Sequence, residues 1–185
     1  VDCVDNLLEI LEEFPSYRFL LDAQTIVLED YLEIRPEREA ELQSHVAAGR
    51  ILIGPWYVQN DFFLTSGEAT VRNLLIGTKD AERFGGCMRV GYMPDQFGLL
   101  SQLPQIFAGF GIRSALFGRG YGFDPPKKSE FRWHSPDGSS VLAVNMPYWY
   151  NNAQRFPDSI VESLRLVEGN REKKKKTATT NHFLL

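Results

Sequence analysis

The residue most suited to chemistry in this chain is Asp95, within residues 90–104. This segment predicts a short buried strand, a turn that carries Asp95, and then a helix with Ser101 as its N-cap. Catalytic groups of α/β folds commonly lie just past the carboxyl ends of strands. Pro94 restricts the backbone before the carboxylate, and Phe97 supplies an apolar wall. Asp95 is therefore a candidate for chemistry, although the pattern alone fits a turn or helix-capping aspartate equally well.

The motif around this carboxylate resembles that of a known family. Residues 91–98 read Gly-Tyr-Met-Pro-Asp-Gln-Phe-Gly, which is similar to the strand-end motif of glycoside hydrolase family 38, the retaining α-mannosidases. In that family the aspartate of this motif is both the catalytic nucleophile and a ligand of the active-site metal. The resemblance implies both roles for Asp95.

Further segments resemble the same family and follow its order along nearly the whole chain. Residues 54–58, Gly-Pro-Trp-Tyr-Val, are similar to a Gly-Gly-Trp-Val element. Residues 115–119, Ala-Leu-Phe-Gly-Arg, resemble a strand that delivers an active-site arginine. Residues 131–133 and 145–148 resemble a hairpin that leads to the aromatic wall of the sugar site.

Alternating strand and helix patterns favour an α/β fold with a largely parallel sheet. Helices are expected at 4–14, 23–34, 36–48, 66–84, about ten residues after the third strand, and 159–167, and strands at 17–21, 50–54, 90–92, 113–117, 131–134 and 141–146. The resemblance implies part of a seven-stranded α/β barrel of the glycoside hydrolase/deacetylase type. It also implies that residues 1–185 are part of one N-terminal catalytic domain, truncated at both ends.

Local signals predict details of two helices. Residues 65–68, Thr-Ser-Gly-Glu, match a capping box, with Leu64 placed for a hydrophobic staple. The helix that follows is expected to turn Leu74 and Leu75 inward. Gly169 is expected to end the last helix.

Charge and composition limit the classes of partner and the cellular location that we expect. The net charge of −4 gives no electrostatic reason to bind nucleic acid, and the four lysines at 173–176 are read as a solvated loop. No apolar run reaches the roughly 18 residues that a membrane span needs. Cys3 and Cys87 lie far apart without a metal-binding spacing, and two free thiols suit a reducing, cytoplasmic location. The oligomeric state is left open, with a homo-oligomer allowed.

Five side chains are candidates for substrate binding. Asp61 could accept hydrogen bonds from sugar hydroxyls, and a solvated loop aspartate is the equal alternative. Arg119 could bind the sugar or orient Asp95, the alternative being a surface ion pair. The aromatic candidates for stacking on a pyranose ring are Phe97, Tyr148 and Tyr150.

The metal site implied by the resemblance is incomplete in this sequence. The family holds zinc with an upstream His-x-Asp pair, the nucleophile and a downstream histidine. None of the three histidines, His45, His134 and His182, has His-x-Asp spacing, and all three are read as ordinary helix, strand or loop residues. Zinc is therefore expected to bind Asp95 and further ligands that lie outside this chain.

The resemblance thus implies a metal-dependent retaining α-mannosidase that hydrolyses mannose-containing oligosaccharides through a covalent glycosyl-aspartate intermediate. Retaining enzymes need two carboxyl groups about 5–5.5 Å apart. Asp95 fits the nucleophile, and the acid/base residue is expected outside the chain. Two alternatives stay open: a metal-dependent carbohydrate deacetylase, with Asp95 as base or ligand, and a non-catalytic carbohydrate-binding module.

Overall fold

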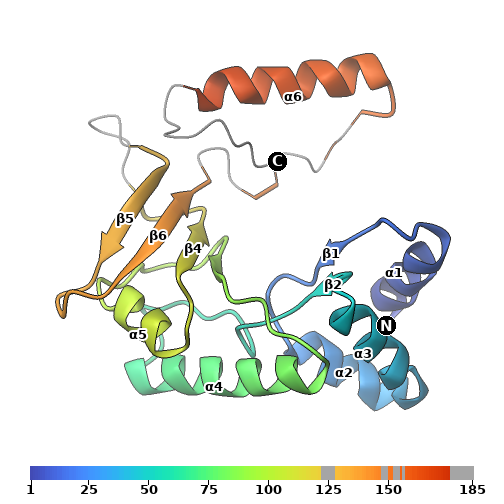
Figure 1. The fold of residues 1–185 in the computed structure, drawn as a ribbon, viewed down its shortest axis with the longest axis horizontal. Helices are drawn as coiled ribbons and strands as arrows, with labels where there is room; N and C mark the ends of the chain where they lie inside the picture. Colours follow the sequence, from blue (N-terminus) through green and yellow to red (C-terminus); the bar gives the residue numbers. More distant parts are fainter. Residues whose placement is uncertain (122–127, 147–149, 152–154, 156, 176–185) are drawn as a thin grey trace. The chain divides into compact units, whose positions relative to one another are not determined.

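The chain consists of two compact units, Val1–Arg89 and Val90–Leu185 (Figure 1). The computed structural model describes residues 1–121, 128–146, 150–151, 155 and 157–175.

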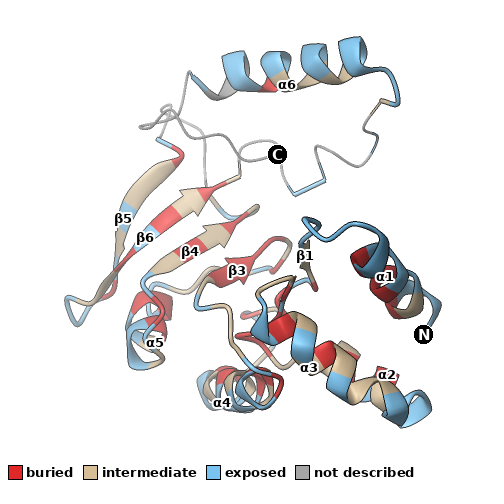
Figure 2. Cartoon of the chain, turned by 45° about the vertical axis from the view of Figure 1, so that its right-hand side comes forward, coloured by how far each residue is buried: buried red, intermediate tan, exposed pale blue. Residues whose placement is uncertain are grey.

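The first unit packs helices around a pair of short parallel strands. Its elements are α1 (Asp2–Glu13), β1 (Phe19–Leu20), α2 (Ile26–Ile34), the 3₁₀ helix η1 (Pro36–Arg38), α3 (Glu39–Ala47), β2 (Ile51–Leu52) and α4 (Gly67–Arg83). Phe19 of β1 is in register with Ile51 of β2. The core is formed by apolar side chains at helical spacing, among them Leu8, Leu11 and Leu28, all fully buried, and Figure 2 shows the buried stripe of α1 in red.

The start of α4 differs from the predicted capping box by one residue. Ser66 is the N-cap, and its hydroxyl accepts a hydrogen bond of 3.1 Å from the backbone N–H of Ala69. Glu68 instead accepts a hydrogen bond of 2.7 Å from Arg72 one turn later. Leu64 is 83% exposed, so the predicted hydrophobic staple is wrong. The staple residue is the one directly before the N-cap. A shift of the N-cap by one residue therefore removes Leu64 from the staple position.

The inward face of α4 is set by the loop that follows β2. Leu74 is fully buried as predicted, whereas Leu75 is 54% exposed, which contradicts the prediction. A Cβ atom at Gly77 would lie 2.2 Å from the backbone of Trp56 and Tyr57. The bare face of Gly77 therefore lets the loop backbone lie directly on the helix, and this close approach fixes which side of α4 is buried.

The second unit contains a four-stranded sheet. Its elements are β3 (Gly91–Met93), α5 (Leu103–Gly109), β4 (Ser114–Phe117), β5 (Glu130–His134), β6 (Ser140–Asn145) and α6 (Ile160–Lys174). The strand order is β3-β4-β6-β5. The first three are parallel, and β5 is antiparallel to β6 as the predicted hairpin requires (Figure 1).

Helix α5 packs on this sheet through Phe107. A Cβ atom at Gly91 of β3 would lie 2.6 Å from the Phe107 ring, so glycine makes room for that ring. The predicted N-cap, Ser101, is wrong: Gln102 occupies that position. The carbonyl of Ser101 instead accepts a hydrogen bond of 2.9 Å from Ser135, in the turn of the hairpin. This bond ties the entry of α5 to the β5–β6 turn.

Two predictions at the carboxyl end of the chain are wrong. Helix α6 passes through Gly169, where an added Cβ would meet no atom within 4 Å. The lysine run begins inside this helix, since α6 includes positions 173 and 174. In the described residues, no helix combines the length and apolar character that crossing a membrane would require.

The α/β class and the parallel arrangement are confirmed. Among the described residues there are six strands in two sheets of two and four. The seven-stranded barrel therefore stays a prediction.

Candidate active site

Asp95 lies on the loop that directly follows β3. All three residues of β3 are buried, and so is Pro94 after them. The strand therefore anchors the loop in the core, while the Asp95 side chain is 45% exposed. The prediction of a carboxylate at the end of a buried strand is confirmed.

Arg119 reaches the same edge of the sheet from the neighbouring strand. Met93 of β3 is in parallel register with Phe117 of β4, so the residues two positions further on emerge side by side. The Nε–H of Arg119 donates a hydrogen bond to Oδ1 of Asp95, and the two groups form an ion pair. Because the Arg119 side chain is 31% exposed and that of Asp95 is 45% exposed, water screens the attraction. The pair therefore orients the carboxylate more than it stabilises the fold.

Phe97 supports this arginine. The guanidinium carbon of Arg119 lies 4.7 Å from the centre of the Phe97 ring, within the range of a cation–π contact. The ring is 54% exposed. Phe97 thus packs against the group that holds Asp95, instead of packing in the core.

Gln96 is a site residue that sequence reasoning missed. Its side chain is only 4% exposed, although it lies between the exposed side chains of Asp95 and Phe97. Its Oε1 accepts a hydrogen bond of 3.3 Å from the backbone N–H of Asp95. An amide within a loop gives no periodic signal, but its place beside a candidate nucleophile could have drawn attention to it.

The remaining candidates for substrate binding are Asp61, Tyr148 and Tyr150. Asp61 lies in the first unit, in the turn before α4, where its backbone carbonyl accepts hydrogen bonds from Leu64 and Thr65. Tyr148 lies outside the described residues. Tyr150 is 44% exposed, as a binding residue would be. Their roles in substrate binding stay predictions.

The described residues do not form a metal site. No group of three or more histidine, cysteine, aspartate or glutamate side chains in the described part of the chain is placed to hold an ion. His45 lies near the end of α3, where burial lowers the pKa of its imidazole. His134 ends β5, and His182 lies outside the described residues. Cys3 and Cys87 are free thiols. A zinc site needs more ligands than Asp95.

Comparison with known proteins decides the family. The model of the glycosyl hydrolases family 38 N-terminal domain matches residues 1–185. The chain belongs to this family. The family motifs predicted this membership. Asp95, Arg119 and Phe97 therefore lie in a family 38 domain.

Relatives and solved structures agree with this assignment. A protein of Halalkalibacterium halodurans named "Putative mannosylglycerate hydrolase" is 47% identical over 170 residues, which are 85% of this chain and 19% of that protein. Human "Alpha-mannosidase 2C1" is 31% identical over 170 residues, covering 90% of this chain and 16% of that protein. The crystal structure of an alpha-mannosidase from Enterococcus faecalis V583 matches with a TM-score of 0.91 and 35% identity, covering 98% of this chain and 21% of that one.

The family 38 chain is thus similar to one region of much longer proteins. It spans between 16% and 21% of the length of each of these three.

Proposed function

We propose that this chain is part of the catalytic domain of a retaining α-mannosidase, with Asp95 as the nucleophile. The observation that supports this most directly is the Asp95–Arg119 ion pair at the carboxyl edge of β3 and β4. A structural ion pair has no need of this location, whereas α/β enzymes place their chemistry at this edge. The family membership of the chain supports the same assignment.

The chemistry proposed for Asp95 is attack on the anomeric carbon of a mannoside. One carboxylate oxygen forms a bond to C1 while the bond from C1 to the glycosidic oxygen breaks, and a second carboxyl group protonates the leaving oxygen. Water then hydrolyses the mannosyl-aspartate, so that the configuration at C1 is retained. Arg119 bonds Oδ1, which among the described contacts leaves Oδ2 of Asp95 for the attack.

Arg119 and Gln96 supply orientation for this step. Arg119 holds the carboxylate from one side, and Gln96 accepts a hydrogen bond from the Asp95 backbone. A carboxylate whose backbone and side chain are both held loses less freedom when it reaches the transition state. The acid/base residue is proposed to come from a segment of the protein beyond this chain.

Zinc is proposed as the cofactor, with Asp95 as one ligand. In this family 38 domain the described residues do not fit a complete site, since Asp95 has no cluster of further ligands around it. The remaining ligands are proposed to come from elsewhere in the intact protein. No step above passes through the metal.

Three further features belong to the same proposal. The sheet of the second unit would form part of a seven-stranded barrel in the intact protein. The substrate would be a mannose-containing oligosaccharide, and the location cytoplasmic. The similarity to the Enterococcus faecalis alpha-mannosidase supports the fold and the substrate.

A second candidate concerns the leaving group. The bacterial relative at 47% identity carries the name of a mannosylglycerate hydrolase. An α-mannoside of glycerate would use the same attack by Asp95 on the mannosyl C1 but would release a small charged acid. Comparing hydrolysis of mannosylglycerate with that of α-mannobiose by the intact protein separates the two substrates.

Covalent trapping tests the proposed reaction. The intact protein would be treated with a 5-fluoro mannosyl fluoride, digested and examined by mass spectrometry. A mannosyl adduct on the peptide that contains Asp95 is expected. An adduct on a different carboxylate would contradict the assignment of the nucleophile. Release of acetate from acetylated sugars without an adduct would indicate a deacetylase, and sugar binding without turnover would indicate a binding module.

A further inference from the structure

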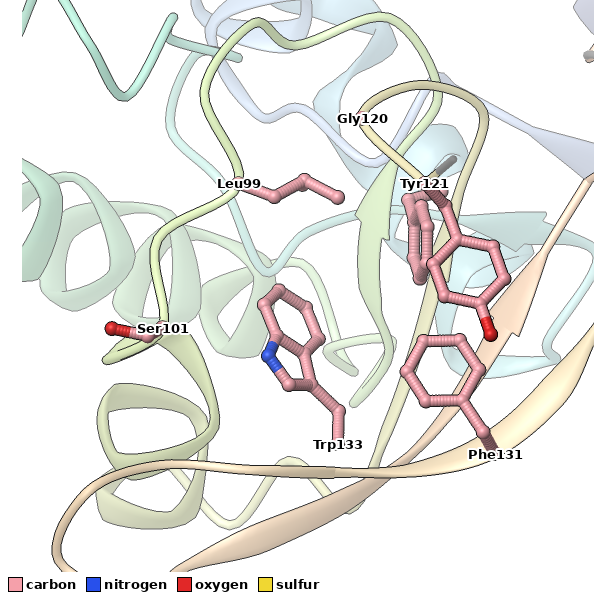
Figure 3. Close-up of a pocket in the computed structure, with 7 residues that line it drawn as sticks. Leu99, Ser101, Gly120, Tyr121, Phe131 and Trp133 are labelled. Carbon is pink, nitrogen blue, oxygen red and sulfur yellow. The ribbon is translucent and has the colours of Figure 1, made fainter. Parts of the chain in front are cut away.

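A cavity of about 300 Å³ opens in the second unit where the loops after β3 and β4 meet (Figure 3). Leu99 lines it from the loop that carries Asp95, and Gly120 lines it directly after Arg119. The two loops are in close contact, since a Cβ atom at Gly120 would lie 3.2 Å from the Leu99 side chain. The cavity therefore begins within a few residues of the Asp95–Arg119 pair, on both loops.

Aromatic rings form the walls of this cavity and support one another. The rings of Tyr121 and Phe131 are stacked, with centroids 4.6 Å apart and planes 5° apart. Phe117 meets each of them edge-on at 6.1 Å, and its centroid lies 5.9 Å from that of Trp133. Phe131 and Trp133 are two residues apart on β5, so they project from the same face. Rings that are fixed in this way cannot collapse into the space.

The lining has the composition of a binding site for a neutral ring. Among the described residues, no charged side chain lines the cavity, so an ionic group would lose its hydration there without gaining a partner from them. Two lining side chains carry polar groups beside the rings, the Tyr121 hydroxyl and the indole N–H of Trp133, whereas the Ser101 hydroxyl points away from the rings (Figure 3). Burial raises the pKa of the Tyr121 hydroxyl, so this group stays a neutral hydrogen-bonding partner.

The volume of the cavity and the exposure of its rings also fit a neutral ring as ligand. Small-molecule sites occupy about 300–1,000 Å³ and combine apolar walls with a few polar groups, and this cavity is at the lower end of that range. Phe117 is buried, whereas Tyr121, Phe131 and Trp133 are half-buried. The three half-buried rings therefore keep part of their surface accessible to a ligand. A pyranose offers an apolar C–H face for such rings and hydroxyl groups for the polar atoms.

We propose that this aromatic pocket binds the neutral sugar ring of the leaving group, next to the mannosyl group that Asp95 attacks. The proposal rests on the function proposed above and names the substrate class that the site selects. It favours an oligosaccharide over mannosylglycerate, because a glycerate carboxylate would find no cation among the described side chains that line the pocket.

Substrates that share the mannosyl group but differ in the leaving group test this proposal. The intact protein and its Tyr121→Leu and Trp133→Leu variants would be assayed with α-mannobiose, mannosylglycerate and α-mannosyl fluoride. For both variants we expect kcat/KM on α-mannobiose to fall about three- to tenfold, the scale of one lost aromatic contact. Hydrolysis of the fluoride and of mannosylglycerate should stay unchanged, because neither leaving group carries a sugar ring.

Tyr17→Leu is the matched control, since Tyr17 is an exposed tyrosine of the first unit outside the pocket. It should leave all three substrates unchanged. Equal losses on all three substrates in the pocket variants would overturn the proposal, because they would indicate a structural role. Unchanged hydrolysis of α-mannobiose would overturn it as well.

A binding measurement separates this proposal from the proposed reaction. Free mannose, the leaving group of α-mannobiose, would be titrated while tryptophan emission is recorded, with Trp133→Phe defining the part of the signal that comes from Trp133. We expect a saturable change that Tyr121→Leu weakens several-fold. If the wild-type protein hydrolysed no mannoside, this change would still support a sugar pocket. A titration in which Trp133 does not respond would overturn the pocket, whatever the outcome of the trapping experiment.

Discussion

The loops after β2 and β3 both follow short strands and both match family motifs, yet they differ in which side chains they expose. In the first unit, the loop after β2 carries Trp56, which is fully buried and packs against Phe62 with ring centroids 5.8 Å apart. In the second unit, the loop after β3 carries Asp95 and Phe97, whose side chains are about half exposed. The same position in the α/β plan therefore buries an aromatic ring in one unit and presents a carboxylate to solvent in the other.

The hydrogen bonds of the two loops show the same difference. Asn73 of α4 accepts a hydrogen bond of 2.9 Å from the backbone N–H of Tyr57 and donates one to the carbonyl of Val58. These bonds satisfy the loop backbone and leave the Trp56 ring in the core. In the loop after β3, Arg119 bonds the carboxylate of Asp95, and Gln96 bonds its backbone N–H. A motif match thus locates a loop, and the exposure of its side chains indicates which residues can reach a substrate.

The largest expected effect comes from removing the carboxylate. Asp95→Ala in the intact protein should lower kcat on an aryl α-mannoside by several orders of magnitude, because no other group replaces the nucleophile. Asp95→Glu should leave little activity, since the longer side chain shifts the oxygen from its position beside Arg119.

Asp158→Ala is the control for this prediction, because Asp158 is an exposed carboxylate of the same unit. It should keep wild-type kcat. If Asp95→Ala kept a tenth of wild-type kcat with unchanged circular dichroism, the nucleophile would have to be another residue.

The second prediction concerns the loop after β2. Trp56→Ala should destabilise the protein by about 3–5 kcal/mol, because it leaves a large cavity in the core of the first unit. The thermal midpoint should fall, while kcat per folded molecule changes little. Phe63→Ala serves as the control, since Phe63 is 75% exposed and its loss should be nearly neutral. A wild-type midpoint for Trp56→Ala would show that this loop does not depend on the buried ring.

The third prediction separates charge from geometry at the ion pair. Arg119→Lys keeps the positive charge but loses the planar group that both bonds Asp95 and stacks on Phe97. Hydrogen bonds to charged groups contribute about 1.5–3 kcal/mol, so kcat/KM should fall about ten- to a hundredfold. Arg132→Lys, at an exposed position of β5, should have no effect. Equal kcat/KM for Arg119→Lys and wild type would mean that Arg119 acts only through its charge.

The smallest expected effect is at the supporting ring. Phe97→Leu keeps an apolar side chain but removes the aromatic face, and a cation–π contact at an exposed site contributes about 0.5–1 kcal/mol. We expect kcat/KM to fall about two- to fivefold. A double-mutant cycle with Arg119→Lys should show that the two losses are not additive. Additive losses would mean that Phe97 acts on the substrate independently of Arg119.

Much of this arrangement could be predicted from the sequence. The order of helices and strands, the β5–β6 hairpin and the position of Asp95 after a buried strand followed from periodicity, turn residues and the family motif. These features depend on residues within a few positions of one another, so local propensities and side-chain spacing record them. The arginine was also found by resemblance, with a surface ion pair left open as the alternative.

What only the tertiary structure decided depends on contacts between distant segments. The partner of Arg119 follows from the register of β3 and β4, which no spacing along the chain reveals. The exposure of Leu75 also depends on a distant segment. The loop after β2 lies directly on Gly77, and this contact sets which face of α4 is buried. Gly169 lies inside α6, at a place where an added Cβ would meet no described atom within 4 Å. The aromatic pocket needs rings from β4, β5 and a loop, and their convergence is set by strand pairing, not by local sequence.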